Sequence, residues 1–144
     1  MEPTAFTQQL DDAQIAEAIR LAEVSTSGEI RVFITRSHSV KPLEDARREF
    51  YRLGMASTAL RNAVLLYFAP ATQRFAVYGD EGVYLRCEAS FWESTTREME
   101  ALLKDGKFHE AVLTGIRRAG DELARQFPKH GADRNDLPNE VVRD

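Results

Sequence analysis

Four residues with oxygen-bearing side chains lie at the ends of apolar segments of the sequence. Glu29 comes directly before "IRVFI", Asn62 comes directly before "AVLLYFA", and Asp80 and Glu81 follow "RFAVYG". If the three segments are neighbouring strands, the first two parallel and the third antiparallel, these side chains reach the same edge of one sheet. Carboxylate and amide oxygens are the ligands that calcium prefers. The pattern predicts a divalent-cation site for Ca²⁺, or alternatively Mg²⁺, formed by Glu29, Asn62, Asp80 and Glu81.

Each of these residues also has a simpler interpretation. Glu29 is placed to pair with Arg31 or Arg61, or to lie on the surface as a solvated carboxylate. The segment "YGDEG" has the glycines and the aspartate that a tight turn uses for backbone reasons. Asn62 suits a cap or a turn. The convergence of three strand ends favours the site more than any one residue does.

The opposite edge of the sheet is a rival location. Ligands of open α/β sheets often bind beyond the carboxyl ends of parallel strands. At that edge the chain presents the polar residues Arg36, Ser37, His38, Ser39, Glu44 and Asp45. This loop is suited to an anion, but the sequence has no glycine-rich phosphate motif.

Hydrophobic patterning predicts the strands that position the candidate residues. "EIRVFITR" alternates, and "AVLLYFA" is a continuous apolar run of the kind found where helices cover both faces of a sheet. The first two strands are joined by a crossover helix, so we expect them to be parallel. The short link "PATQ" makes the third strand antiparallel to the second. The sequence therefore predicts a three-layer α/β/α sandwich with a small mixed sheet.

Apolar stripes at helical spacing predict the remaining elements. Asp11 is expected to cap the first helix, and Pro42 to lie in the first turn of the second. Residues 81–87 suit a short helical turn. Ser90 with Glu93 is expected to form a capping box for the next helix, and a long amphipathic helix follows Gly106.

Composition and charge restrict the class of protein. The chain has 144 residues, a net charge of −4 and one cysteine. Its length predicts one domain, over 5–130, followed by a polar tail over 131–144. The acidic balance argues against nucleic acid as a partner. The sequence shows no signal peptide and no apolar segment of roughly 20 residues, so we expect a cytoplasmic protein that is not itself inserted in a membrane.

Several blocks of the sequence, in order, resemble the TPM domain family. They include "TSGEIRVFI", "FYRLGMASTALRNAVLLYFA", "RFAVYGDEGV" and "GKFHEAVLTGI", and the resemblance runs from about residue 5 to residue 141. The form resembled is the short, stand-alone, soluble bacterial type. The family motif falls on Gly28 with Glu29, on Asn62, and on Gly79 with Asp80 and Gly82. Two departures are Asn62-Ala63, where the family often has Asn-Gly, and Ser90, where relatives commonly have an acidic residue.

The resemblance implies an α/β/α fold and divalent-cation binding, calcium especially. It implies a regulatory or interaction module whose partner is a membrane-associated or cytosolic protein. Some plant members resemble acid phosphatases, so the alternative is a metal-dependent phosphatase acting on phosphomonoesters. In that alternative Arg61 would hold the phosphate, and Asp80 or Glu29 would be the base. A third hypothesis is an interaction domain that needs no metal.

Overall fold

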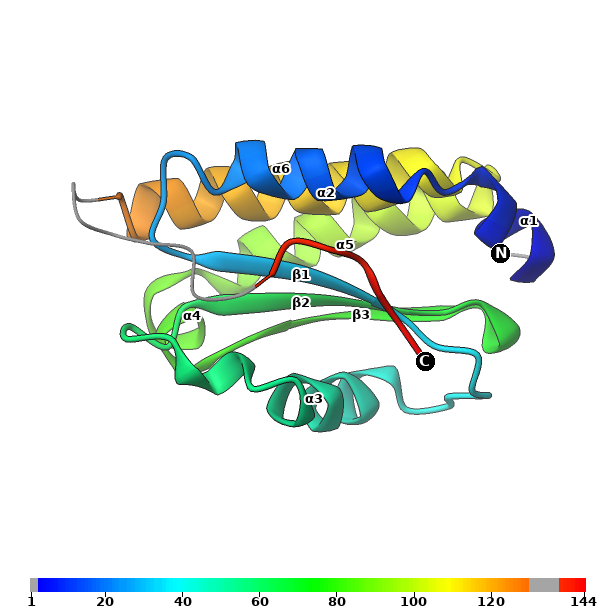
Figure 1. Ribbon diagram of the computed structural model, residues 1–144, viewed down its shortest axis with the longest axis horizontal. Coiled ribbons are helices and arrows are strands. Elements are labelled where there is room, and N and C mark those ends of the chain that lie inside the picture. The colour runs from blue at the N-terminus through cyan, green and yellow to red at the C-terminus, as the bar shows by residue number, and fades with distance from the viewer. Residues whose placement is uncertain (1–2, 130–137) are drawn as a thin grey trace.

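The computed structural model describes residues 3–129 and 138–144 of the chain. A mixed sheet lies between helices on both of its faces (Figure 1). Its strand order is β3-β2-β1-β4, with β1 at Glu29–Ile34, β2 at Ala63–Ala69, β3 at Arg74–Gly79 and β4 at Val142–Arg143. β1 is parallel to β2 and β4, whereas β3 is antiparallel to β2. The predicted α/β/α sandwich with a mixed sheet is confirmed.

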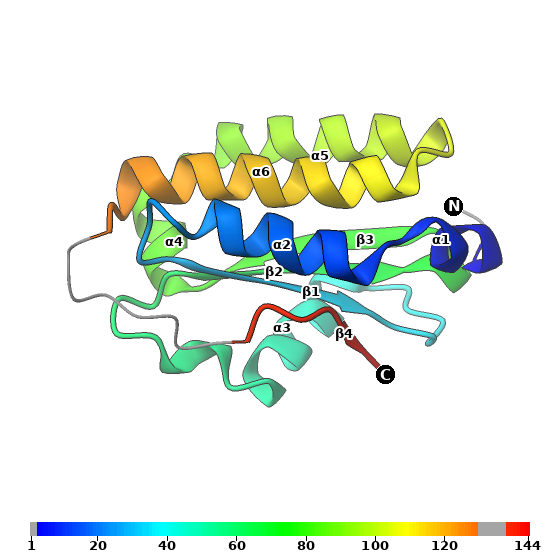
Figure 2. The ribbon, with the colours of Figure 1, turned by 45° about the horizontal axis from the view of Figure 1, so that its top comes forward.

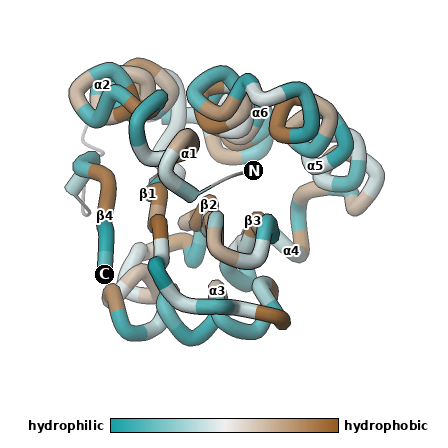
Figure 3. The backbone as a smooth tube through the Cα atoms, turned by 90° about the vertical axis from the view of Figure 1, so that its right-hand side faces the viewer, coloured by the Kyte–Doolittle hydropathy of each residue, from teal (hydrophilic) through white to brown (hydrophobic). Residues whose placement is uncertain are grey.

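The helices form two layers around this sheet. They are α1 (Pro3–Gln9), α2 (Asp12–Ala22), α3 (Pro42–Arg52), α4 (Glu81–Arg86), α5 (Ala89–Lys104) and α6 (Phe108–Gln126), with short 3₁₀ helices at Met55–Ser57 and Pro70–Thr72. α2, α5 and α6 cover one face, and α3 covers the other (Figures 1 and 3). In the part of the chain that the structure describes, none of these helices combines the length and the apolar character needed to cross a membrane.

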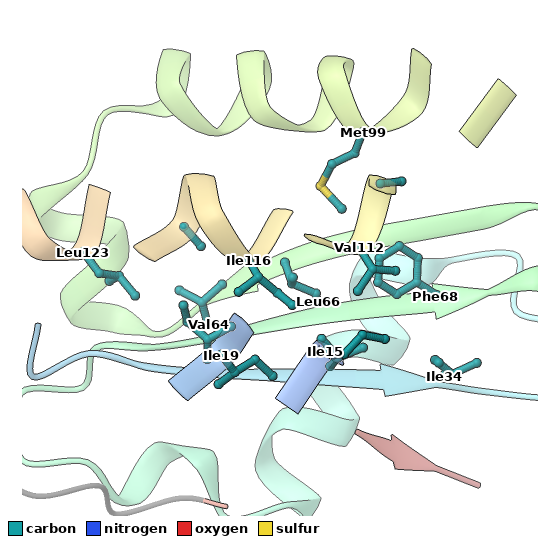
Figure 4. Packing of buried hydrophobic residues seen from close by; sticks show 14 of the residues in the cluster. Ile15, Ile19, Ile34, Val64, Leu66, Phe68, Met99, Val112, Ile116 and Leu123 are labelled. Atoms are coloured by element: carbon teal, nitrogen blue, oxygen red, sulfur yellow. The ribbon is translucent and has the colours of Figure 1, made fainter. Parts of the chain in front are cut away.

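Alternation along the strands divides the core between the two faces. Ile30, Val32 and Ile34 pack with the helices of the first layer, where Figure 4 shows side chains of α2, α5 and α6 meeting the sheet. Phe33 points to the other face and packs with Phe50 of α3. All seven residues of β2 are buried. Burial on both faces explains why the sequence of this strand is a continuous apolar run.

One helix cap is as predicted and one is not. The Asp11 carboxylate accepts a hydrogen bond of 3.0 Å from the Gln14 N–H and caps α2, as expected. The prediction of a capping box formed by Ser90 and Glu93 is wrong. Because Glu88 is the last extended residue, α5 begins at Ala89 and Ser90 lies inside its first turn, where its hydroxyl is 3.5 Å from Glu88 Oε2.

The C-terminal residues add a strand that the sequence did not predict. Within the tail expected over 131–144, residues 131–137 lie outside the described part, and β4 runs beside β1 with Val142 opposite Phe33 (Figure 2). The Asp144 carboxylate accepts hydrogen bonds from the Thr35 hydroxyl and, at 2.7 Å, from the Arg36 N–H. These contacts attach the end of the tail to the edge of the sheet.

Candidate cation site at one edge of the sheet

The three predicted strand ends lie in one row. Glu29 is opposite Ala63 in the parallel β1–β2 pair. On the other side of β2, the Asp80 N–H donates to the Ala63 carbonyl oxygen at 3.0 Å. The first residues of β1 and β2 and the residue after β3 are therefore neighbours across the sheet, which is the arrangement of strand ends that the sequence predicts.

The loop before β2 is packed tightly against the start of α4. The Gly82 N–H donates to the Arg61 carbonyl oxygen at 2.8 Å. A Cβ atom at Gly82 would lie 2.3 Å from the Leu60 carbonyl oxygen, so only glycine fits this approach. Arg61 has a φ of 53°, a left-handed conformation that non-glycine residues rarely adopt. The loop thus holds the Arg61 backbone in an uncommon conformation beside Asp80.

Asp80 is buried and is bound by Arg61 on both carboxylate oxygens. The Arg61 Nε and Nη2 atoms each donate at 2.7 Å, to Oδ2 and Oδ1 of Asp80. The Asp80 side chain is 1% exposed. Asp80 Oδ1 also accepts from the Glu81 N–H at 2.8 Å and caps α4. This hydrogen-bonded carboxylate raises the pKa of Arg61 above its ordinary value.

Glu81 is the exposed neighbour of this pair. Its carboxylate lies 3.6 Å from Arg61 Nη1, and its side chain is 66% exposed. Arg61, Asp80 and Glu81 are therefore brought together as an ion-pair group. The guanidinium that was expected to hold an anion already faces two carboxylates.

Glu29 lies beside another buried acid, Glu23, which the sequence analysis did not select. Glu29 and Glu23 are 2% and 7% exposed, and their carboxyl groups share a hydrogen bond. Glu23 Oε2 also accepts from the Ile30 N–H at 2.7 Å. Burial, followed by the negative charge of Glu29, raises the pKa of Glu23 to about 8. At neutral pH the Glu23 carboxyl group therefore keeps its proton.

One signal in the sequence could have found Glu23. It follows α2 directly, as the residue that caps its C-terminal end. A carboxylate is unfavourable at the C-terminus of a helix, where the helix dipole is negative. The negative charge of an acid at that position, a few residues before Glu29, is therefore expected to be compensated by a proton or a cation.

Asn62 connects the loop and strand ends through hydrogen bonds. It is 1% exposed, and its carbonyl oxygen accepts from the Glu29 N–H at 3.4 Å. Its side-chain Nδ2 donates to Ser27 Oγ at 3.1 Å, and its N–H donates to the Thr58 hydroxyl at 3.2 Å. Donation through Nδ2 leaves the amide oxygen Oδ1 as the atom of this side chain that could serve a cation.

The acidic residues of this edge fall into two groups. Glu23 lies beside Glu29 and has a raised pKa, and Asp80 with Glu81 faces Arg61. Among residues 3–129 and 138–144, no group of three or more His, Cys, Asp or Glu side chains is arranged to hold a metal ion. A cation that used both groups would have to replace the Glu23 proton and draw Asp80 away from Arg61. The oxygen atoms of these residues are of the kind that binds a divalent cation. A cation would have to compete for them with the Glu23 proton and with Arg61.

Comparison with known proteins identifies the family. The model of the TPM domain matches residues 4–122. The NMR structure of BA42 protein from the psychrophilic bacterium Bizionia argentinensis is 34% identical, with a TM-score of 0.87, and the match covers 94% of this chain and 96% of that one. The N-terminal domain of cg2496 protein from Corynebacterium glutamicum has a similar fold, with 15% identity, a TM-score of 0.63 and coverage of 88% and 80%. A search of curated proteins finds no match. The chain belongs to the TPM domain family.

Proposed function

We propose that this TPM domain binds a divalent cation, with Ca²⁺ as the first candidate, at the sheet edge that contains Glu29. The observation that carries the proposal is the pair of buried carboxyl groups, Glu23 and Glu29. Burying two like-charged groups side by side is unfavourable unless a proton or a cation compensates the charge. A cation would supply that compensation above the pH at which the proton is lost.

The chain has the ligand types that calcium requires at this edge. Glu23 and Glu29 would supply charged oxygens, and Asn62 would supply a neutral one. Asp80 would join them when Arg61 moves away, with Glu81 at the exposed side. Calcium accepts carbonyl oxygens and waters for its remaining positions, so a complete set of acidic ligands is not needed.

Competition with the Glu23 proton makes the proposed affinity dependent on pH. Below about pH 8 the Glu23 carboxyl group holds a proton, and a cation must displace it. We therefore expect calcium to bind more weakly as pH falls through this range. A site made only of exposed carboxylates would keep its affinity down to about pH 5.

The test is a calcium titration of the metal-stripped protein, followed by amide NMR shifts and by calorimetry. We expect shifts at residues 23–30, 58–63 and 79–82, and loss of binding in Glu29→Gln and Glu23→Gln. Glu110→Gln, an exposed acid on α6, is the matched control and should bind as the wild type does. If millimolar calcium moves none of these signals, or if Glu29→Gln binds normally, the site is not at this edge.

A cation at this edge would act as a regulatory element of an interaction module. It would change the contacts of the 58–62 loop and of α4, because Arg61 and Asp80 join the two. Nothing in the geometry of Arg61 favours the phosphatase alternative, since its guanidinium faces Asp80 and Glu81. Phosphatase activity on phosphomonoesters stays a prediction.

A further inference from the structure

The outer edge of β3 offers backbone groups to another strand. β3 is the last strand on its side of the sheet, and within the described residues no strand pairs with its outer edge. In an antiparallel pair, opposite residues alternate between those that exchange hydrogen bonds and those that do not. The Asp80 N–H donates to the Ala63 carbonyl oxygen. Every second residue before it, Tyr78 and Ala76, therefore also directs its N–H and C=O groups towards β2. The N–H and C=O groups of Phe75, Val77 and Gly79 therefore point away from β2.

Two cavities lie along this edge, one at each end of the strand. One, of about 320 Å³, is lined by Gln73, Arg74 and Phe75 and by the α5 residues Glu100, Leu103 and Lys104, with Pro42. The other, of about 600 Å³, is lined by Val77, Tyr78 and Gly79. Its remaining walls include Leu43 of α3, Val83 of α4 and Trp92 of α5. We call the two cavities together the β3 groove. Each of the three residues with outward backbone groups lines it.

The β3 groove lies behind the outer surface of α5. Its position favours a single extended chain as the bound partner over the edge of a second sheet. α5 runs antiparallel to β3, because Trp92 lies in the cavity at Gly79 and Lys104 lies in the cavity at Arg74. Figure 3 shows α5 extending outward beyond β3, with α3 beneath the sheet. A second copy that paired its own β3 here would bring its α5 against this one. A single strand meets no such obstacle.

The two ends of the β3 groove differ in polarity and in charge. The half at Val77 and Gly79 is mostly apolar, and Tyr84 beside it is 82% exposed. The half at the start of β3 carries Arg74 and Lys104, and Lys104 lies 2.9 Å from Glu100. Arg74 therefore leaves an excess of positive charge at that end, whereas Glu93 lies at the apolar end.

We propose that the β3 groove binds an extended segment of another protein, which adds to the sheet as a further strand beside β3. Main-chain hydrogen bonds to Phe75, Val77 and Gly79 would hold it, and alternate side chains would enter the apolar half. The segment is apolar over Val77 and Gly79 and carries an acidic residue where it passes Arg74. This proposal does not depend on cation binding.

The experiment selects random peptides of about ten residues, displayed on phage, against the full chain. Enriched sequences are then measured against Val77→Pro and its control, Val77→Thr. Proline removes the outward N–H and leaves the bonds to β2 intact, because the Val77 N–H points away from β2. Threonine keeps that N–H. We expect the proline variant to weaken binding at least about tenfold and the threonine variant to have little effect.

Two further variants keep the test valid if Val77→Pro does not fold. Leu43→Glu changes an exposed wall residue, and Arg74→Glu reverses the charge at the other end. Both should weaken the selected peptides, whereas Arg48→Glu, on the exposed side of α3, should not. Bound peptides should move amide signals at residues 74–79 and 89–104.

Three results would overturn the proposal. Selection that enriches no apolar, extended sequence would do so, as would peptides that bind all variants equally. A wild-type chain that forms dimers, with Val77→Pro monomeric in light scattering, would instead assign the groove to a second copy of the chain.

Discussion

The Arg61 guanidinium binds both carboxylate oxygens of Asp80, through two hydrogen bonds of 2.7 Å. Asp80 is the N-cap of α4, and the Arg61 carbonyl accepts from Gly82 in the first turn of that helix. The two residues thus join the loop before β2 to the helix after β3 by side chain and by main chain. The pair has a structural role whether or not a cation binds nearby.

Two substitutions of Asp80 separate its charge from its cap. Asparagine caps helices as well as aspartate does, so Asp80→Asn keeps the cap and removes the negative charge, together with one of the two hydrogen bonds from Arg61. Asp80→Ala removes both, and we expect it to be less stable than Asp80→Asn by about 1 kcal/mol. Urea unfolding of the two variants measures the difference. Equal stabilities would mean that the hydrogen bond to the Glu81 N–H contributes nothing to α4.

Replacement of Arg61 should increase calcium affinity. Arg61→Gln removes a positive charge that occupies both oxygens of Asp80, so the carboxylate becomes available to a cation. We expect calcium to bind about tenfold more tightly in calorimetry, and to raise the melting temperature of the variant more than that of the wild type. Arg48→Gln, which breaks an exposed ion pair with Asp45, is the control. An unchanged affinity would exclude Asp80 from the site.

Hydrophobic patterning was enough for most of the fold. The continuous run of β2 and the alternation of β1 place these strands correctly, because the apolar sides of amphipathic helices cover both faces of the sheet. β4 could not be found in this way, since a two-residue strand has no periodicity to detect. It depends on pairing with β1 and on the Asp144 contacts, which are tertiary.

The candidate site was predictable as a set of strand ends but not as a set of contacts. Strand order and direction bring Glu29 and Asp80 to one edge, and these follow from chain connectivity. The partners of each carboxylate depend on side-chain direction. Glu23 is close to Glu29 only because α2 ends above the start of β1, and Arg61 reaches Asp80 from a left-handed backbone. The position of Glu23 at the end of α2 marks it as an unusual acid, but no local pattern encodes its contact with Glu29 or that of Arg61 with Asp80.

The raised pKa of Glu23 predicts a loss of stability as pH rises. The folded pKa of about 8 lies above the ordinary value of 4.5, so the folded state holds more protons between these values. The contribution of Glu23 to stability is therefore full below about pH 4.5 and is lost as pH rises through about 8. Glu23→Gln removes this dependence and should be more stable than the wild type at about pH 8.5, by roughly 1–3 kcal/mol. Chemical unfolding at several pH values measures it.

The control for this pH experiment is Glu110→Gln, on the exposed face of α6. Its unfolding free energy should keep the pH dependence of the wild type. If Glu23→Gln also kept that dependence, the pKa of Glu23 would not be raised in the folded protein.

Gly82 should tolerate alanine poorly because its neighbours are backbone atoms. A Cβ there would lie 2.3 Å from the Leu60 carbonyl oxygen and 2.8 Å from that of Arg61. We expect Gly82→Ala to cost about 2 kcal/mol and to move the amide signals of residues 60–62. Gly106→Ala is the comparison, since its Cβ would meet nothing within 4 Å and only its φ of +74° opposes it, a cost of about 1 kcal/mol. The opposite order of stability would contradict the close approach at Gly82.

Removal of residues 142–144 should loosen the edge of β1 that β4 covers, without unfolding the domain. The deletion takes away β4 and the Asp144 carboxylate, which accepts from the Thr35 hydroxyl and the Arg36 N–H. We expect a loss of about 1–2 kcal/mol in unfolding free energy, because a few hydrogen bonds are lost and no large side chain leaves the core. Hydrogen exchange should accelerate at residues 33–36 and stay slow in β2, which is paired on both sides. Asp144→Ala separates the carboxylate from the strand: if it alone reproduces the whole loss, pairing between β4 and β1 adds no stability of its own.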